Sequence, residues 1–397
     1  MAYKRPTYSQ YKEALKDVSL PAAWADMDAI DKNIADILVR AKSTPIRLAS
    51  KSVRCRHILS YILEQDTQFQ GIMCYHPKEA AFLAGHGMDD LLIAYPSMCE
   101  ESLREACKAA KSKTIYFMID CVEHVQQLDR IAGQEGVKAL LCLDLDMSVD
   151  FPGLLFGVFR SPIRNAEQAV DLYRAIKSFA NTELCAVMGY EAQIAGLGDK
   201  LPGKLVENQV VKKLQQKSIP IIAERRKSTV EALRNQGADI RLVNGGGTGS
   251  IESTIQESIV TEVTVGSGFY SPHLFDYYSK FKHKPAAGFA LEVSRKPRPN
   301  MYTCTGGGYI ASGAAGTLKQ PVPHLPLKTK FVKNEGLGEV QTPFTYKGDM
   351  LSIGDPVFMR HCKAGELCER FNFLHLLRDN KIIDTVPTYR GEDQCFV

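Results

Sequence analysis

The sequence has little that would suit a membrane protein, a secreted protein or a disulfide framework. None of its apolar runs approaches the roughly 18–20 residues that a membrane-spanning helix needs, and residues 1–8 lack the apolar core of a signal peptide. Cysteine occurs 11 times, an odd number, and no CxxC pair is present. Free thiols in a reducing cytoplasm fit this pattern better than disulfides or a zinc module.

The sequence also lacks a strong excess of charge. Its 49 basic and 45 acidic residues leave a net charge of +4, and the densest basic patch, residues 294–298, is short. A nucleic-acid-binding face would need clustered positive charge. With 45% apolar and 24% charged residues among 397, the composition is that of a globular chain long enough for two domains. We expect a cytoplasmic protein that binds neither nucleic acid nor membranes.

Short apolar runs alternate with amphipathic runs between about residues 45 and 265. Eight of the apolar runs predict strands: Ile46–Ser50, Gly71–Cys74, Leu91–Ala94, Thr114–Ile119, Ala139–Leu145, Leu184–Gly189, Ile240–Val243 and Glu262–Val265. Apolar strands joined by helices indicate a buried parallel sheet. Eight such units predict an α/β fold closed into a (β/α)8 TIM-type barrel, with a doubly wound open sheet as the alternative. Residues 219–223 could form a further strand, but we interpret them as helix with Pro220 in its first turn.

The composition and periodicity of the sequence change after about residue 285. Helical periodicity fades, glycine and proline cluster, and turn signals separate short β-like stretches over Pro356–Met359, Phe373–Leu377 and Lys381–Thr385. These features predict a smaller, mainly antiparallel β domain over residues 285–397. It would follow a barrel domain over residues 21–284, and residues 1–20 are expected to pack on the β domain.

Two predicted strand ends carry groups suited to catalysis, since reactive groups in such barrels lie at the carboxyl ends of the strands. Lys51 follows the first strand, where partial desolvation would lower the pKa of its amine and favour a Schiff base with an aldehyde. A solvated lysine is the plainer alternative. After the seventh strand, Asn244–Ser250 contains three consecutive glycines, whose N–H groups could bind a phosphate together with the Thr248 and Ser250 hydroxyls.

The residues at the end of the eighth strand, 266–270, could complete this phosphate site. Tight turns are the alternative for both glycine-rich segments, but a glycine run between a strand and a helix favours phosphate binding. An amine and a phosphate cradle at one barrel mouth point to a single cofactor. Pyridoxal 5′-phosphate (PLP) carries an aldehyde at one end and a phosphate at the other. The two features therefore support each other more than either does alone.

Several stretches then resemble the PLP-dependent enzymes of the alanine racemase fold, also called fold type III. These stretches are residues 21–28 with Asn33, residues 47–51 and the glycine-rich bend. The C-terminal part is similar to the D-threonine aldolase and D-serine dehydratase-like branch, in the amino acid deaminase/aldolase subset, over residues 188–193, 336–343 and 360–366. The resemblance implies a PLP-bearing barrel with a β domain. It also implies a homodimer in which the partner's β domain completes each active site.

The resemblance further implies roles for single residues. Lys51 would form the Schiff base, and Arg160 would reach the phenolic oxygen of the cofactor or the substrate carboxylate. Tyr190 would lie beside the pyridine ring. The remaining cofactor-binding residues would be Asn244, Gly246, Gly247, Thr248, Gly268 and Tyr270. A core tyrosine and an exposed loop arginine are the plain alternatives for Tyr190 and Arg160.

One motif departs from these relatives, which pair a histidine with Asp or Cys two residues later to bind a divalent metal. Here His361 is followed by Lys363, whose ammonium group is not a metal ligand. Metal dependence is therefore uncertain. Lys363 would supply positive charge in place of the metal, or His361 would chelate an ion together with Glu366 or Cys368. A purely structural role for His361 is the third alternative.

These features predict a PLP-dependent lyase for a β-hydroxy amino acid, D-configured by analogy with the relatives. The pyridinium ring would act as an electron sink, and His361 would act on the β-hydroxyl in retro-aldol cleavage or in dehydration with release of ammonia. An amino acid racemase is an alternative, with Tyr309 or Tyr389 as a candidate second base. A non-catalytic PLP-binding protein is another, although the additional β domain argues against it.

Overall fold

The computed structural model describes residues 3–314 and 316–397 of the chain. Contacts divide it into two compact units. The first unit comprises Met1–Ile37, Ser52–Ile58 and Ser267–Cys395, and the second comprises Leu38–Lys51, Leu59–Gly266 and Phe396–Val397. The units interleave along the sequence, so the domain boundaries expected at residues 20 and 284 stay a prediction. No helix within the described residues is both long and apolar enough to cross a membrane.

Eight parallel strands close a barrel within the second unit, in the ring order β10-β11-β2-β3-β4-β5-β6-β9. Their bounds are β2 Ile46–Ala49, β3 Phe69–Cys74, β4 Leu91–Ile93, β5 Ile115–Ile119, β6 Ala139–Asp144, β9 Thr182–Gly189, β10 Leu242–Gly245 and β11 Glu262–Val265. Each strand overlaps one of the eight predicted apolar runs. The TIM-type barrel is therefore confirmed, and the alternative of a doubly wound open sheet is wrong.

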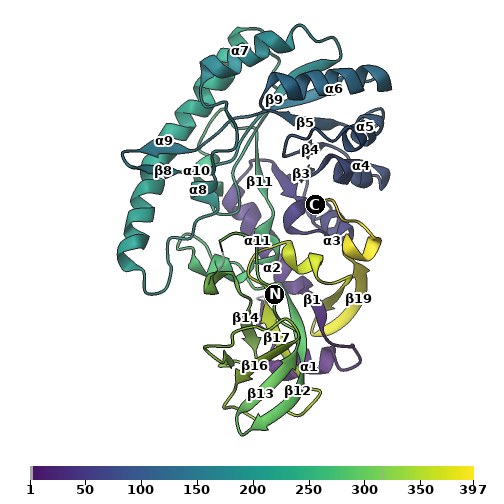
Figure 1. The fold of residues 1–397 in the computed structure, drawn as a ribbon, viewed down its shortest axis with the longest axis vertical. Helices are drawn as coiled ribbons and strands as arrows, with labels where there is room; N and C mark the ends of the chain where they lie inside the picture. Colours follow the sequence, from purple (N-terminus) through teal and green to yellow (C-terminus); the bar gives the residue numbers. More distant parts are fainter. Residues whose placement is uncertain (1–2, 315) are drawn as a thin grey trace. The chain divides into compact units, whose positions relative to one another are not determined.

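Helices connect, precede or follow the barrel strands in the sequence, and Figure 1 shows α4, α5 and α6 next to one another on the outside of β3, β4 and β5. The helices are α2 Met27–Ala41, α3 Arg56–Leu63, α4 Pro77–Gly85, α5 Glu100–Ala109, α6 Val122–Glu135, α7 Ala166–Ile176, α8 Ala192–Ala195, α9 Leu205–Asn235, α10 Ile251–Thr254 and α11 Ser267–Tyr270. A hairpin of β7 Val149–Phe151 and β8 Leu154–Phe156 precedes α7.

Residues 219–223 are helical as predicted, but Pro220 lies in the interior of α9 rather than in its first turn. The helix begins at Leu205, because the polar segment before Pro220 continues the same helix. Proline removes one backbone donor from a helix interior without preventing the flanking turns from forming. The sequence analysis placed the start of this helix too late.

The barrel interior has an apolar side and a polar side. Side chains of alternate residues on β4, β5, β6, β9 and β10 form the apolar cluster of Leu92, Met118, Cys142, Ala186, Met188 and Leu242. On the polar side, the Arg47 guanidinium on β2 donates to Glu262 Oε1 on β11 at 2.6 Å and to Asp90 Oδ1 at 2.9 Å. Arg47 is 1% exposed, so this ion pair fixes β2 from inside the barrel.

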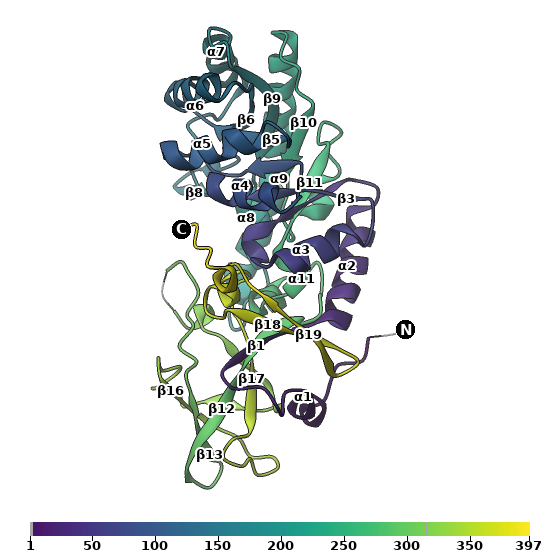
Figure 2. The same ribbon diagram turned by 90° about the vertical axis from the view of Figure 1, so that its right-hand side faces the viewer.

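The first unit contains a nine-stranded sheet that is antiparallel except where β1 pairs with β18. Its strands are β1 Ala22–Asp26, β12 Ala287–Arg298, β13 Met301–Thr305, β14 Val322–Leu325, β15 Lys330–Phe331, β16 Gln341–Thr345, β17 Pro356–Arg360, β18 Phe373–Arg378 and β19 Lys381–Pro387. Figure 2 shows β1, β18 and β19 side by side, as their pairing requires. The predicted mainly antiparallel β domain is confirmed. It includes β1, although residues 21–284 were expected to form the barrel domain.

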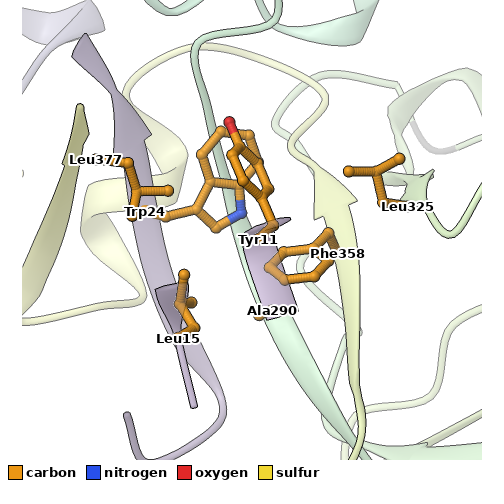
Figure 3. Close-up of a cluster of buried hydrophobic side chains, with 7 residues drawn as sticks. All are labelled: Tyr11, Leu15, Trp24, Ala290, Leu325, Phe358 and Leu377. Carbon is orange, nitrogen blue, oxygen red and sulfur yellow. The ribbon is translucent and has the colours of Figure 1, made fainter. Parts of the chain in front are cut away.

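An aromatic cluster forms the core of this sheet (Figure 3). Trp24 of β1, the only tryptophan in the chain, is fully buried and packs against Tyr11 at a ring-centroid distance of 5.1 Å. Phe358 of β17 lies 5.4 Å from the same tyrosine ring. Tyr11 belongs to α1, Tyr8–Ala14, and its hydroxyl donates to Asp26 Oδ2 at 2.8 Å. Burial of each such aromatic side chain contributes about 1.5–3 kcal/mol to stability, so α1 is fixed firmly to β1 and β17.

Candidate active site

Lys51 lies at the carboxyl end of the barrel strand β2, as predicted. The strand ends at Ala49, and Lys51 sits in the single turn Ser50–Ser52 that follows. Its Nζ is 3.2 Å from the hydroxyl of Tyr95 and 5.6 Å from the centre of the Tyr95 ring. The amine is therefore held at the mouth of the barrel, where reactive groups of such barrels are found.

Arg160 approaches the same tyrosine from the loop after β8. Its guanidinium carbon lies 5.7 Å from the centre of the Tyr95 ring, and its backbone N–H donates to Asp146 Oδ2 at 3.0 Å. Burial raises the pKa of Tyr95, but Lys51 and Arg160 together lower it by more than burial raises it. The pKa of Tyr95 is therefore below the usual value of 10. Two cations around one phenol make this part of the mouth suitable for an anionic group.

Sequence reasoning missed Tyr95, although a signal was present. Tyr95 follows the predicted strand Leu91–Ala94 directly. The rule that identified Lys51, namely to inspect the residues after each barrel strand, would also have identified this tyrosine.

Tyr190 and the glycine-rich bend belong to the same mouth. Burial, followed by Glu191 and Tyr95, raises the pKa of Tyr190 to about 12, while Arg160 lowers it. A Cβ atom added to Gly247 would lie 3.2 Å from Tyr190 Cε2 and 2.8 Å from the Ala195 Cβ. The bend can approach the tyrosine ring this closely only because residue 247 is glycine.

A buried ion pair that sequence reasoning missed organises this bend. Glu191 Oε2 accepts hydrogen bonds from the Gly246 N–H at 3.2 Å and from Arg226 Nη2 at 3.0 Å, and Arg226 also pairs with Glu257. The Gly247 N–H donates to Ser250 Oγ at 3.1 Å. The N–H groups of Gly246 and Gly247 thus hold the bend in shape, whereas the sequence suggested that they bind phosphate. The motif at residues 188–193 contained Glu191, but nothing local indicated its partner.

The next two expected cofactor-binding residues have structural contacts. Asn244 is 1% exposed, and its amide donates to Glu262 Oε1 at 2.7 Å and to Thr264 Oγ1 at 2.8 Å inside the barrel. Thr248 is buried, and its carbonyl accepts a hydrogen bond from Arg40 Nη2 at 2.6 Å. Asn244 therefore contributes to the polar side of the barrel interior, one level below the bend.

A further residue that the sequence analysis missed is Asp144, the last residue of β6. Burial raises its pKa from 3.8 to about 7, and Asp120 raises it as well, while Arg160 lowers it. A carboxyl group with this pKa exchanges its proton near neutral pH, which suits acid–base work. Alternation along the strands places Asp120, Asp144 and Tyr190 one level above the buried Met118, Cys142 and Met188.

Three other expected site residues belong to the first unit. Tyr270 is fully buried and donates its hydroxyl to the Val53 carbonyl at 3.2 Å, and the Gly268 carbonyl lies 3.1 Å from His283 Nδ1. His361 is 4% exposed. Its Nδ1 lies 3.2 Å from the Ala287 carbonyl, and that acceptor requires the ring proton to be on Nδ1.

The other ring nitrogen of His361 therefore carries a lone pair. Nε2 is buried, and no described residue gives it a hydrogen-bond partner. Burial, followed by the charge of Arg360 and by His273, lowers the pKa of His361 to about 3. The ring is neutral at physiological pH, and its Nε2 can accept a hydrogen bond or bind a metal ion.

The residues around the histidine motif have their own contacts. Lys363 Nζ donates to Ser312 Oγ at 3.0 Å, and Glu366 Oε1 accepts from the Ser312 N–H at 2.9 Å. Cys368 Sγ donates to the Val53 carbonyl at 3.3 Å. In the part of the chain that the structure describes, His361 belongs to no group of three side chains arranged as metal ligands.

The groups at the barrel mouth fit PLP by their chemistry. Lys51 provides an amine for the aldehyde, and Arg160 provides a cation for a phenolic or carboxylate oxygen. Tyr190 provides an aromatic flank, and Gly247 allows a close backbone approach beside it. A cofactor with an aldehyde, an aromatic ring and anionic groups needs these features together.

Comparisons with known proteins agree with this arrangement. Residues 25–273 match the model of the alanine racemase N-terminal domain. The 3-hydroxy-D-aspartate aldolase of Paracoccus denitrificans (strain Pd 1222) is 21% identical over 253 residues, which are 63% of this chain and 60% of that relative, less than two thirds of its length.

Solved structures show the same fold. A D-threonine aldolase from Filomicrobium marinum has a TM-score of 0.80 and 17% identity, covering 95% of this chain and 96% of that one. The D-threo-3-hydroxyaspartate dehydratase from Delftia sp. HT23 has a TM-score of 0.74 and 17% identity, covering 94% and 98%. Because the family model covers more than half of the sequence, the chain belongs to the alanine racemase family, and this membership implies PLP as its cofactor.

Proposed function

We propose that this protein is a PLP-dependent lyase that acts on a D-configured β-hydroxy amino acid, by retro-aldol cleavage or by dehydration with release of ammonia. One observation carries the proposal. The Lys51 amine and Arg160 meet at Tyr95, in the same barrel mouth as Tyr190 and the glycine-rich bend. The names of the relatives, an aldolase and a dehydratase of 3-hydroxyaspartate and a threonine aldolase, support the substrate class.

The residues of the second unit would have different roles. Lys51 would hold the cofactor through its aldehyde group and would take or return the proton at Cα of the substrate. Arg160 would orient an anionic oxygen, and Tyr190 would flank the ring. PLP supplies an electron sink for the charge that develops at Cα. Thr248 would bind the phosphate, while Gly246 and Gly247 would act by permitting its close approach.

The residues of the first unit keep their expected roles as predictions. These are phosphate contacts for Gly268 and Tyr270 and action on the β-hydroxyl for His361. The Nε2 lone pair of His361 and its pKa of about 3 favour a hydrogen-bond acceptor or a metal ligand over a general acid, because the ring carries no spare proton near pH 7.

Two views of the C-terminal motif remain as proposals. In the first, Lys363 supplies positive charge in place of a metal, and its contact with Ser312 Oγ at 3.0 Å is compatible with a fixed ammonium. In the second, His361 binds an ion with Glu366 or Cys368. A stoichiometric divalent ion that disappears on His361→Ala would contradict the first view.

A product assay tests the proposed function. The purified protein should be yellow from bound PLP, and Lys51→Ala should lose that colour. Lys138→Ala is the matched control, since Lys138 is an exposed lysine before the amino end of barrel strand β6 and should leave the colour unchanged. Incubation with D-serine, D-threonine and D-3-hydroxyaspartate should yield a keto acid if the enzyme is a dehydratase and an aldehyde if it is an aldolase. An inverted amino acid would instead indicate a racemase, and no product from a broad panel would indicate a non-catalytic PLP-binding protein.

We also propose that the protein is a cytoplasmic homodimer. All 11 cysteines are free in the structure, which suits a reducing compartment. Light scattering should give twice the chain mass of 44.0 kDa. A mass equal to one chain would contradict the dimer.

A further inference from the structure

A second group of reactive side chains follows β5. Asp120, Cys121 and His124 each offer one potential ligand atom, and these three atoms lie within 4.8 Å of one another. His124 Nδ1 is 3.0 Å from Asp120 Oδ1 and 3.2 Å from Cys121 Sγ. We propose that Asp120, Cys121 and His124 form a binding site for a divalent cation of the zinc class.

The strand-to-helix turn brings the three residues together. Strand β5 ends at Ile119, and α6 begins at Val122 with Cys121 as its N-cap. Residues three and four apart on a helix lie on the same face, so the His124 side chain lies next to the side chains of Cys121 and Asp120.

The spacing of the ligand atoms suits a zinc ion. With Zn–S near 2.3 Å and Zn–N and Zn–O near 2.0–2.2 Å, ligand atoms of a tetrahedral site lie roughly 3.4–3.6 Å apart. The observed separations of 3.0 and 3.2 Å need to increase by only a few tenths of an ångström. A mixture of thiolate, imidazole and carboxylate favours zinc and similar metals, whereas magnesium and calcium prefer oxygen ligands alone.

The contacts of His124 Nδ1 are compatible with a bound cation. The backbone N–H of Asp120 lies 3.4 Å from Nδ1 and requires a lone pair there, whereas the Asp120 carboxylate at 3.0 Å requires a proton on the same atom. One nitrogen of a neutral imidazole offers either the lone pair or the proton, not both. A cation bound to the Nδ1 lone pair and to the carboxylate would take the place of the proton in the 3.0 Å contact.

The surrounding charge also favours a cation. Ile119 pairs with Leu143 across β5 and β6, so Asp144 stands beside Asp120 at the end of the next strand. Glu123 follows Cys121 directly. These carboxyl groups offset the partial positive charge at the N-terminal end of α6, which by itself would disfavour a cation.

Three protein ligands leave a tetrahedral ion with one open position, as in catalytic rather than structural zinc sites. The site lies after a barrel strand, at the mouth that holds Lys51. If the proposed function is correct, the open position would bind a hydroxyl or carboxylate oxygen of the substrate, and the ion would act as a Lewis acid. This substrate role rests on the proposed function, whereas ion binding does not.

Zinc binding to the full-length PLP-loaded protein tests the site. The protein is stripped with a chelator, dialysed against Zn²⁺ and subjected to elemental analysis and zinc X-ray absorption. We expect one zinc per chain with a sulfur neighbour at about 2.3 Å. Cys121→Ser and His124→Gln should each weaken zinc binding by roughly tenfold or more, because each loses one ligand bond. Asp120→Asn is the further variant if either of these fails to fold, as judged by circular dichroism.

One control variant locates the ion. Cys99 is the N-cap of α5 as Cys121 is of α6, and it belongs to no such ligand group among the described residues, so Cys99→Ser should bind zinc normally. The proposal is overturned if the wild-type protein binds no zinc, or if the Cys121 and His124 variants retain it. Because zinc is measured without substrate, a lack of lyase products would overturn the proposed function alone.

Discussion

Lys51 and Arg160 reach Tyr95 from two different loops, and the chemistry of the mouth depends on this convergence. Either cation alone would be an ordinary charged side chain at the end of a strand or in a loop. Together they lower the pKa of a partly buried phenol against the effect of burial. At the scale of single residues, the site is therefore defined by a field of positive charge rather than by a sequence motif.

This field predicts how Tyr95 titrates. In cofactor-free protein, one tyrosine should ionise below the usual pKa of 10 because both cations stabilise the phenolate. Arg160→Gln should raise that pKa, and Tyr95→Phe should abolish the early transition in tyrosinate absorbance. Arg241→Gln, at an exposed arginine, is the control and should change nothing. Persistence of the early transition in Tyr95→Phe would show that another tyrosine produces it.

The raised pKa of Asp144 predicts that the stability of the protein depends on pH. Its pKa is about 7 in the folded protein and 3.8 ordinarily, so the folded state binds the proton more tightly and stability falls as the pH rises between these values. Asp144→Asn should therefore gain stability over the wild type from pH 4 to pH 7, by at most ~1.4 kcal/mol per pH unit. Urea unfolding at a series of pH values measures this difference. Asp150→Asn, at an exposed aspartate, is the control, and a flat difference for Asp144→Asn would refute the raised pKa.

The close approach of Gly247 to Tyr190 predicts that a larger residue at position 247 weakens cofactor binding. An alanine there would bring a methyl group within 2.8 Å of the Ala195 side chain and 3.2 Å of the Tyr190 ring. We expect a loss of about 1–3 kcal/mol in stability from overpacking, with weaker retention of PLP in dialysis. Gly85→Ala is the matched control, because a Cβ there meets no atom within 4 Å and alanine favours the helix. Equal behaviour of the two variants would contradict the tight approach of the bend to Tyr190.

At the scale of elements, the long helix α9 supports the bend from outside the barrel. Its Arg226 is fully buried and links Glu191, after β9, to Glu257, after α10. Through Glu191 this one side chain fixes the N–H of Gly246 and the hydroxyl of Ser250. The shape of the glycine-rich bend thus depends on a helix that begins almost 40 residues earlier in the sequence.

Removal of Arg226 should destabilise the protein strongly. Arg226→Ala leaves two buried carboxylates without their cation, which costs about 3–5 kcal/mol when one partner of a buried pair is lost. Urea unfolding measures the loss, and PLP retention should fall with it. Arg241→Ala removes an arginine whose pair with Glu183 is exposed, and the expected change is about 0–1 kcal/mol. A loss of stability for Arg226→Ala as small as that of the control would contradict the role of Arg226 in supporting the glycine-rich bend.

The sequence predicted the barrel strands well because a strand buried on both faces reads as a continuous apolar run, and each of the eight runs stood between helical patterns. It predicted β1 less well, since Ala22–Asp26 looks the same locally whether it joins the barrel or the second sheet. The start of α9 was also misplaced, because a proline that normally opens a helix lies in its interior here.

The sequence likewise indicated some residues of the candidate site and not others. Lys51 and the bend follow from strand ends and glycines, which are local signals. Glu191 and Arg226 act as a pair separated by 35 positions, and no single-sequence pattern joins them. Asn244 looked like part of the bend, yet its amide turns into the barrel, because Glu262 and Thr264 on β11 offer it partners.

At the scale of the whole molecule, the chain combines the barrel of the alanine racemase family with a nine-stranded sheet, and His361 directly follows strand β17 of this sheet. The likeness to the D-threonine aldolase structure extends over 95% of the chain, so the sheet as well as the barrel follows that fold. The proposed activity depends on the attachment of PLP to Lys51.

The most direct test is chemical trapping of the cofactor. Borohydride delivers a hydride to the carbon–nitrogen double bond between PLP and a lysine and converts it to a stable single bond, which peptide mass spectrometry then locates. We expect the phosphopyridoxyl mass on Lys51 of the purified protein and no such mass in Lys51→Ala. Modification of a different lysine, or no modification of PLP-saturated protein, would contradict this expectation.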